Sequence, residues 1–131
     1  MRTIIIEQGQ MVQPEQYKGQ TDIEKVIIHE GAIIGEKSFY DCTGITELTI
    51  AKDVNIGDAA FYFCTSIAEL NIAEGVTIGE RAFLFCTGIT ELNIAEGVTI
   101  GGAFGSCRGI TEVNVANGVI IGKFSFDGCT G

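Results

Sequence analysis

Cysteine recurs along this sequence at a nearly constant interval, and the chemistry open to such thiols is metal binding or disulfide formation. The five positions are Cys42, Cys64, Cys86, Cys107 and Cys129. Their steps of 21 or 22 residues do not match the short spacing of a zinc-binding pair. If equivalent residues stack, side chains that point the same way hold the Cβ atoms wider apart than a relaxed disulfide prefers. We therefore predict free, buried thiols that act as small apolar side chains, with no metal and no cofactor.

Carboxylates form a second periodic set, with four glutamates at one position of a repeat: Glu47, Glu69, Glu91 and Glu112. A row of stacked like charges is unfavourable. It could hold cations, a glycan or a basic partner, or it could be a solvated edge that keeps the molecule soluble, which is the interpretation we favour. Two positions further on are Thr49, Asn71, Asn93 and Asn114. We expect these side chains to hydrogen-bond along the stack, in the middle of any binding face.

Catalytic motifs are missing from the sequence, which has no phosphate-binding loop, no G-x-S-x-G and no paired acid and base at a meaningful spacing. His29, the single histidine, belongs to no recognisable motif that combines it with a nucleophile and a carboxylate. We therefore expect no catalytic residues and no enzyme activity. The formal charge of -9 opposes binding to nucleic acid or to an anionic membrane. The sequence also lacks the apolar run that membrane insertion requires and the pattern of a signal peptide.

The elements that must position these residues follow from an internal repeat. Phenylalanine recurs three residues before each cysteine, and both series step by 22, 22, 21 and 22 because the fourth full repeat is one residue shorter. We predict a single domain over residues 1–131 with repeats at 23–44, 45–66, 67–88, 89–109 and 110–131. Residues 1–22 align with the same unit when shifted by 22 places. Their polar, glutamine-rich sequence predicts a degenerate coil that caps the N-terminal end.

Within each repeat the apolar residues alternate with polar ones. Leu48 and Ile50 alternate with polar neighbours, and a second short alternating run follows a turn at Lys52–Asp53. This period of two predicts two short strands per repeat. The glycine after the second strand, such as Gly57, predicts a corner with positive φ, and the A-F-x-x-C segment predicts a turn or a short 3₁₀ piece. The fold class is therefore mainly β, a solenoid of parallel short strands with about six coils of 21–22 residues.

The repeated string resembles a known family. Residues 75–94, GVTIGERAFLFCTGITELNI, are similar to the BspA-like leucine-rich repeat, and the resemblance extends over residues 23–131 in five copies. It implies a curved, right-handed solenoid whose first strands line a concave face. It also implies adhesion or partner binding, by repeats that are commonly part of larger surface-displayed or extracellular proteins. The family's proline after the first strand is replaced here, for example by Ala73 and Ala95, so a straighter stack is an alternative.

Bulky side chains gather between the phenylalanine and the cysteine of the middle repeats, where the last two repeats have small or polar residues. They are Tyr40, Tyr62, Phe63, Leu84 and Phe85. In a register that stacks equivalent positions they form an apolar edge, which is a contact surface if it is exposed. The alternative is that one or two of them fold back under the turn. A second candidate surface is the C-terminal end, where no polar coil follows the apolar positions and where Phe124 could give partial cover.

The first hypothesis is thus a non-catalytic protein-interaction or adhesion module that binds a protein partner, or another copy of itself, through its sheet face and its aromatic edge. The second is a structural subunit of a larger assembly, such as a virion or surface-layer decoration, that associates through the uncapped end. The third is a cation- or glycan-binding module that uses the glutamate row.

Overall fold

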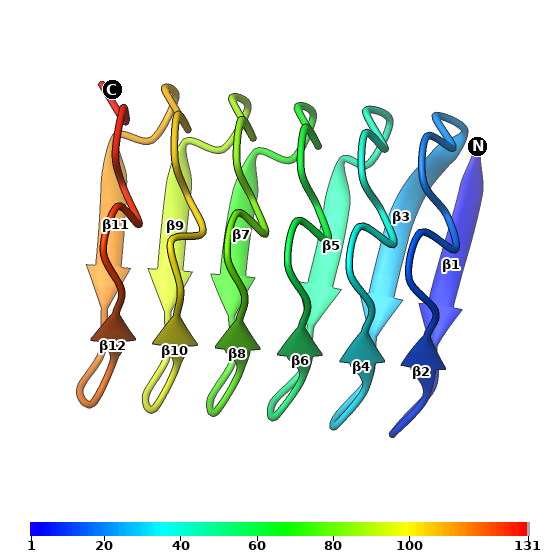
Figure 1. The fold of residues 1–131 in the computed structure, drawn as a ribbon, viewed down its shortest axis with the longest axis horizontal. Coiled ribbons are helices and arrows are strands. Elements are labelled where there is room, and N and C mark those ends of the chain that lie inside the picture. The colour runs from blue at the N-terminus through cyan, green and yellow to red at the C-terminus, as the bar shows by residue number, and fades with distance from the viewer. Residues whose placement is uncertain (131) are drawn as a thin grey trace.

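Each repeat of the sequence folds into one coil of a parallel β-solenoid, as the alternation of apolar residues predicts. The computed structural model describes residues 1–130. Every coil contributes one strand to each of two six-stranded parallel sheets (Figure 1). The first sheet consists of β1 (Arg2–Ile6), β3 (Ile23–Ile28), β5 (Glu47–Ile50), β7 (Glu69–Ile72), β9 (Glu91–Ile94) and β11 (Glu112–Val115). The second consists of β2 (Met11–Val12), β4 (Ile33–Ile34), β6 (Asn55–Ile56), β8 (Thr77–Ile78), β10 (Thr99–Ile100) and β12 (Ile120–Ile121).

The chain descends along a strand of the first sheet, crosses to the second sheet and returns through a turn segment to begin the next coil (Figure 1). The coils wind in the right-handed sense usual for parallel strand connections. Pairing follows the register of the repeat, so that Val26 lies beside Leu48 and Leu70 lies beside Leu92. The divergent residues 1–22 form the first coil of the same stack, with Ile4 beside Val26.

The core is a set of equivalent residues, one from each coil, stacked in rows between the two sheets. Phe39, Phe61, Phe83 and Phe104 are fully buried, and successive rings are nearly parallel with centroids 5.1–5.3 Å apart. The inward residues of β3 to β10 and four of the five cysteines are buried with them. A single coil cannot cover these side chains, so the stability of each coil depends on its neighbours.

The glycine after the second strand of each coil does not have the positive φ that we predicted, so that prediction is wrong. Gly57 has instead no room for a side chain, because a Cβ atom there would lie 2.7 Å from the carbonyl oxygen of Ile34 in the preceding coil. The left-handed residues lie elsewhere, for example in the turn between the two strands at Asp53 (φ 58°) and Gly75 (φ 70°). The A-F-x-x-C segment forms turns, as predicted.

Candidate binding surfaces

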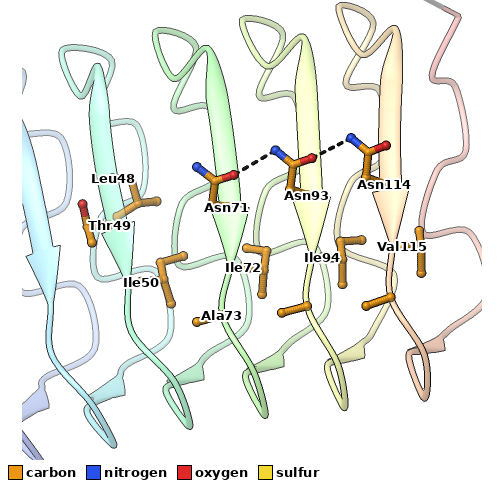
Figure 2. A pocket seen from close by; sticks show the side chains of 12 residues that line it. Leu48, Thr49, Ile50, Asn71, Ile72, Ala73, Asn93, Ile94, Asn114 and Val115 are labelled. Atoms are coloured by element: carbon orange, nitrogen blue, oxygen red, sulfur yellow. Dashed lines mark hydrogen bonds between the residues drawn. The ribbon is translucent and has the colours of Figure 1, made fainter.

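The outer face of the first sheet carries a groove of about 580 Å³ that extends over the third to sixth coils (Figure 2). Outward residues of the strands form one side of it, namely Thr49, Asn71, Asn93 and Asn114. The small residues that follow the strands, Ala73, Ala95 and Ala116, also line it. Methyl groups leave space that larger side chains would fill, so these alanines help to form the groove.

The predicted hydrogen bonds along the asparagine row are present, and we call Asn71, Asn93 and Asn114 the asparagine ladder (Figure 2). The side-chain amide of Asn93 donates to Asn71 Oδ1 at 2.8 Å, and that of Asn114 donates to Asn93 Oδ1 at 2.6 Å. Each ladder amide also donates to the glutamate two residues earlier, as Asn93 does to Glu91 Oε2 at 2.9 Å. Both hydrogens of the Asn93 amide are therefore used within the protein.

The glutamate row is partly compensated by these contacts. Lys25 Nζ lies 3.3 Å from Glu47 Oε2, so the first glutamate is paired with a cation of the preceding coil. Glu69, Glu91 and Glu112 each accept a hydrogen bond from an asparagine of the ladder. Within residues 1–130, no group of three His, Cys, Asp or Glu side chains is arranged to hold a metal ion. The row therefore places negative charge beside the asparagine ladder, next to the residues that line the groove.

The groove crosses the weakest seam of the first sheet, between β5 and β7. These strands pair only at Ile50 and Ile72, whereas β7 and β9 pair along their whole length. Leu48, which is 8% exposed, lines the groove at this seam, while the equivalent Leu70 is fully buried. Thr49 has no amide with which to extend the asparagine ladder across the seam. The sheet is thus least tightly bonded where the groove passes over the third and fourth coils.

The five bulky residues singled out from the sequence meet on the turn side of the solenoid. Tyr40, Tyr62, Phe63, Leu84 and Phe85 are each half-buried, and we call them the aromatic edge. The Tyr40 and Tyr62 rings are stacked at 4.8 Å, and the Phe63 and Phe85 rings at 5.0 Å. Tyr62 packs edge-on against Phe63 at 4.6 Å and joins the two stacks. The residues neither fold away into the core nor stand free in solvent.

Two members of the aromatic edge have a backbone conformation that suits neither of them. Phe63 has φ 63° and Phe85 has φ 59°, and the equivalent position in other coils carries Asp41, Ser106 or Gly128. The left-handed region costs a residue with a side chain about 1 kcal/mol, and aspartate and glycine are the types that enter it most readily. Bulky residues in strained conformations often mark functional sites. The strain is therefore an independent reason to treat this edge as a candidate surface.

A smaller hollow of about 440 Å³ adjoins the aromatic edge, and sequence reasoning missed it. Tyr40 and Tyr62 line it together with one carboxylate from each of three coils: Glu36, Asp58 and Glu80. Lys37 and Arg81 also line it. The sequence does contain a sign of this hollow, because the three acids recur at intervals of 22 residues, each directly after the glycine of its repeat. The Asp58 carboxylate accepts a hydrogen bond of 2.9 Å from the Glu80 amide, so it also supports the turn of the next coil.

The cysteines are free, and four of them are buried, with Cys129 half-buried in the sixth coil. Each thiol donates to a main-chain carbonyl of the preceding coil, as Cys86 does to Phe61 at 3.1 Å. Burial raises the pKa of Cys42 to about 11 and that of Cys107 to about 12. Thiols held protonated in this way are poor nucleophiles and poor metal ligands. They act as structural links between coils.

The geometry defines a leucine-rich-repeat type of β-solenoid. The model of the BspA type leucine rich repeat region matches residues 10–131 in six copies, and the chain belongs to this family. Repeats of this family commonly serve as protein-interaction modules, and their fold is typically a non-enzymatic scaffold. Among solved structures, a leucine-rich repeat protein from T. pallidum superposes with a TM-score of 0.58 at 15% sequence identity, over 95% of this chain and 77% of that one. No curated protein matches the chain. In the part of the chain that the structure describes, no helix could cross a membrane.

Proposed function

We propose that this chain is a non-catalytic interaction module that binds a protein partner in the groove on the outer face of its first sheet. The groove itself carries the proposal, because it is a continuous hollow over four coils that the asparagine ladder borders without obstructing. The aromatic edge provides a second contact surface on the turn side. A partner that reaches both would extend around the solenoid rather than bind at one point.

Charge and shape indicate the kind of partner that the groove would accept. Glu69, Glu91 and Glu112 place negative charge beside the asparagine ladder, next to the groove, whereas Ala73 and Ala95 offer apolar contacts within it. The Asn93 and Asn114 amides use both of their donors within the protein, so the partner would meet a preformed polar surface there. These features suit an extended segment with basic and small apolar side chains. Electrostatic complementarity of this type favours fast association that salt weakens.

The experiment compares two arginine substitutions in the fifth coil. Ala95→Arg places a long side chain in the groove, and Thr99→Arg places the same side chain on the exposed face of β10, outside the groove. The immobilised wild-type and variant chains are used to capture proteins from a cell extract, and the captured proteins are quantified by mass spectrometry. We expect at least one protein to be reduced tenfold or more with Ala95→Arg and to be retained with Thr99→Arg.

A third variant, Phe85→Asp, tests the aromatic edge, because aspartate occupies the equivalent left-handed position at Asp41. Loss of the same captured protein with this variant assigns both surfaces to one partner. If no captured protein distinguishes Ala95→Arg from Thr99→Arg, the groove is not a binding surface and the proposal is wrong.

A further inference from the structure

The groove on the first sheet presents a surface that repeats along the axis of the solenoid. Its side chains form rows that run across the strands, with one asparagine and one alanine from each of three successive coils: Asn71 and Ala73, Asn93 and Ala95, Asn114 and Ala116 (Figure 2). Between the two rows lie Ile72 and Ile94, which are 2% and 3% exposed. Neighbouring strands of a sheet are about 4.8 Å apart, so a segment that runs along the groove meets equivalent side chains at about this interval.

The hydrogen-bond donors along this surface are already used within the protein. The Ala95 amide donates to the Ile72 carbonyl of the preceding coil at 2.9 Å, and the Ala116 amide donates to the Ile94 carbonyl, also at 2.9 Å. The asparagine side chains of β9 and β11 likewise use both of their amide hydrogens. At these coils the groove therefore offers a ligand acceptor oxygens on the asparagines rather than donors.

A surface of this kind disfavours a β-strand as the bound segment. A strand in the groove would bury main-chain carbonyls for which these coils supply no donor, and a buried carbonyl without a partner costs free energy. A polyproline II helix avoids this cost, because its backbone has no internal hydrogen bonds and keeps its carbonyls in water. Its proline residues also have no N–H group that needs an acceptor.

The spacing of the coils favours the same conformation. A polyproline II helix has three residues per turn and rises about 3.1 Å per residue, so equivalent side chains recur about every 9.3 Å. Two coils span about 9.6 Å, so every third side chain would meet every second coil. Side chains on one face of a β-strand recur about every 6.7 Å, which matches neither one coil nor two.

The glutamates beside the asparagine ladder indicate which side chains the segment would carry. Glu69, Glu91 and Glu112 each accept one hydrogen bond from an asparagine through Oε2, and none of the three forms an ion pair within residues 1–130. Glu69 and Glu112 are two coils apart, which is the interval at which equivalent residues of a polyproline II helix recur. A lysine or arginine at every third position would therefore place one cation beside each of these carboxylates.

We infer that the groove binds a polyproline II segment with a basic residue at every third position. This inference rests on the proposed function, since it names the conformation and the composition of the partner segment in the same groove. The segment runs along the solenoid axis, with prolines against the alanine row. Its basic side chains reach across the asparagine ladder to the glutamates.

Fluorescence anisotropy with synthetic peptides tests the inference on the full 131-residue chain. The probe is a labelled twelve-residue repeat of Pro-Pro-Lys, and the control is a repeat of Gly-Ser-Lys with the same length and charge but a flexible backbone. We expect the Pro-Pro-Lys peptide to bind at least tenfold more tightly than the control. Ala95→Arg should weaken its binding at least tenfold and Thr99→Arg less than threefold, although both add the same charge. Circular dichroism verifies that the variants are folded, and Ala73→Arg replaces Ala95→Arg if that variant is not.

Three results would each overturn the inference. Equal binding of the two peptides means that the chain recognises only their charge. No binding of the Pro-Pro-Lys peptide at millimolar concentration means that the groove does not accept this conformation. Binding that Ala95→Arg and Ala73→Arg leave unchanged places the peptide outside the groove.

The capture experiment separates these results from a failure of the proposed function. A captured protein that is lost with Ala95→Arg, together with a Pro-Pro-Lys peptide that does not bind, supports the groove as a binding surface and overturns the inference alone. A Pro-Pro-Lys peptide that binds and is displaced by Ala95→Arg, without any captured protein that distinguishes the variants, supports the peptide preference and contradicts the proposed function.

Discussion

Replacing Asn93 by alanine is the most direct test of how the outer face of the first sheet is held together. This side chain takes part in three hydrogen bonds, with Asn71, Asn114 and Glu91, at 2.6 to 2.9 Å. A net contribution of about 0.5 to 1.5 kcal/mol is typical for one such bond. These bonds lie at a partly exposed surface, so the lower value applies to each. We therefore expect Asn93→Ala to lower the free energy of unfolding by about 1.5 kcal/mol.

Urea denaturation followed by circular dichroism measures the change, and the chain offers a matched control. Asn55→Ala makes the same substitution on the exposed side of β6, outside the asparagine ladder. Surface changes of this type usually alter stability by less than about 0.5 kcal/mol. Asparagine and alanine are both disfavoured in strands, so strand propensity contributes little to either value. A loss in Asn93→Ala no larger than that in Asn55→Ala would refute the reasoning.

Double-mutant cycles separate the ladder bonds from other effects of the substitutions. Asn71→Ala and Asn93→Ala remove the same bond, so their combined loss should be smaller than the sum of the two single losses by about 0.5 kcal/mol or more. Asn71→Ala and Asn114→Ala share no direct bond, and their effects should add. Coupling of equal size in both cycles would mean that the strands, rather than the side-chain amides, carry the interaction.

Three further predictions concern the core and the first coil. The free energy of unfolding should fall as the pH rises above 9, because unfolded thiols ionise near pH 9 while burial holds the pKa of Cys42 at about 11 and that of Cys107 at about 12. The slope is about 1.4 kcal/mol per pH unit for each such thiol, and urea titrations of Cys107→Ser should show a smaller slope than those of the wild type. Gly57→Ala should cost about 2 kcal/mol in a thermal melt because its Cβ would meet the Ile34 carbonyl. Gly97→Ala, whose Cβ would make only an ordinary contact of 4.0 Å with the Gly75 nitrogen at a φ of 70°, should cost about 1 kcal/mol. Gln16→Ala should speed hydrogen exchange of the Gln13 amide by about tenfold and leave that of the Gly57 amide, which donates to Ile34, unchanged.

Much of the fold could be predicted because the sequence repeats itself. The phenylalanine and cysteine series fix the register, and once the register is known each residue lies beside its equivalent in the next coil. The stacking of Phe63 on Phe85 follows from this rule, although 22 positions separate them in the chain. The alternation of Leu48 and Ile50 with polar residues likewise identified the inward side of the strands.

Other features could not be predicted because they depend on backbone positions between coils. The sequence indicates that the corner after the second strand requires a glycine at position 57. A single sequence does not distinguish a positive φ at that glycine from the close approach of another backbone. Gln10 and Gln16 accept hydrogen bonds from the main-chain amides of Glu7 and Gln13, and glutamine has no motif for that role. The groove follows from the absence of side-chain volume at Ala73 and Ala95, which carries no chemical signal until the strands around it are placed.

The loose seam between β5 and β7 changes how the aromatic edge should be understood. At this seam the first sheet keeps a single pair of residues, Ile50 and Ile72, in register. On the turn side of the same two coils, Phe63 stacks on Phe85 at 5.0 Å and Tyr62 packs edge-on against Phe85 at 5.9 Å. Aromatic pairs of this geometry stabilise by about 0.5 to 1.5 kcal/mol each beyond burial. They therefore compensate for weak strand pairing, and this contribution offsets the strain of two phenylalanines in left-handed conformation. A partner bound in the groove would contact the weakly paired strands β5 and β7, while the aromatic stack holds the turn side of the same two coils together.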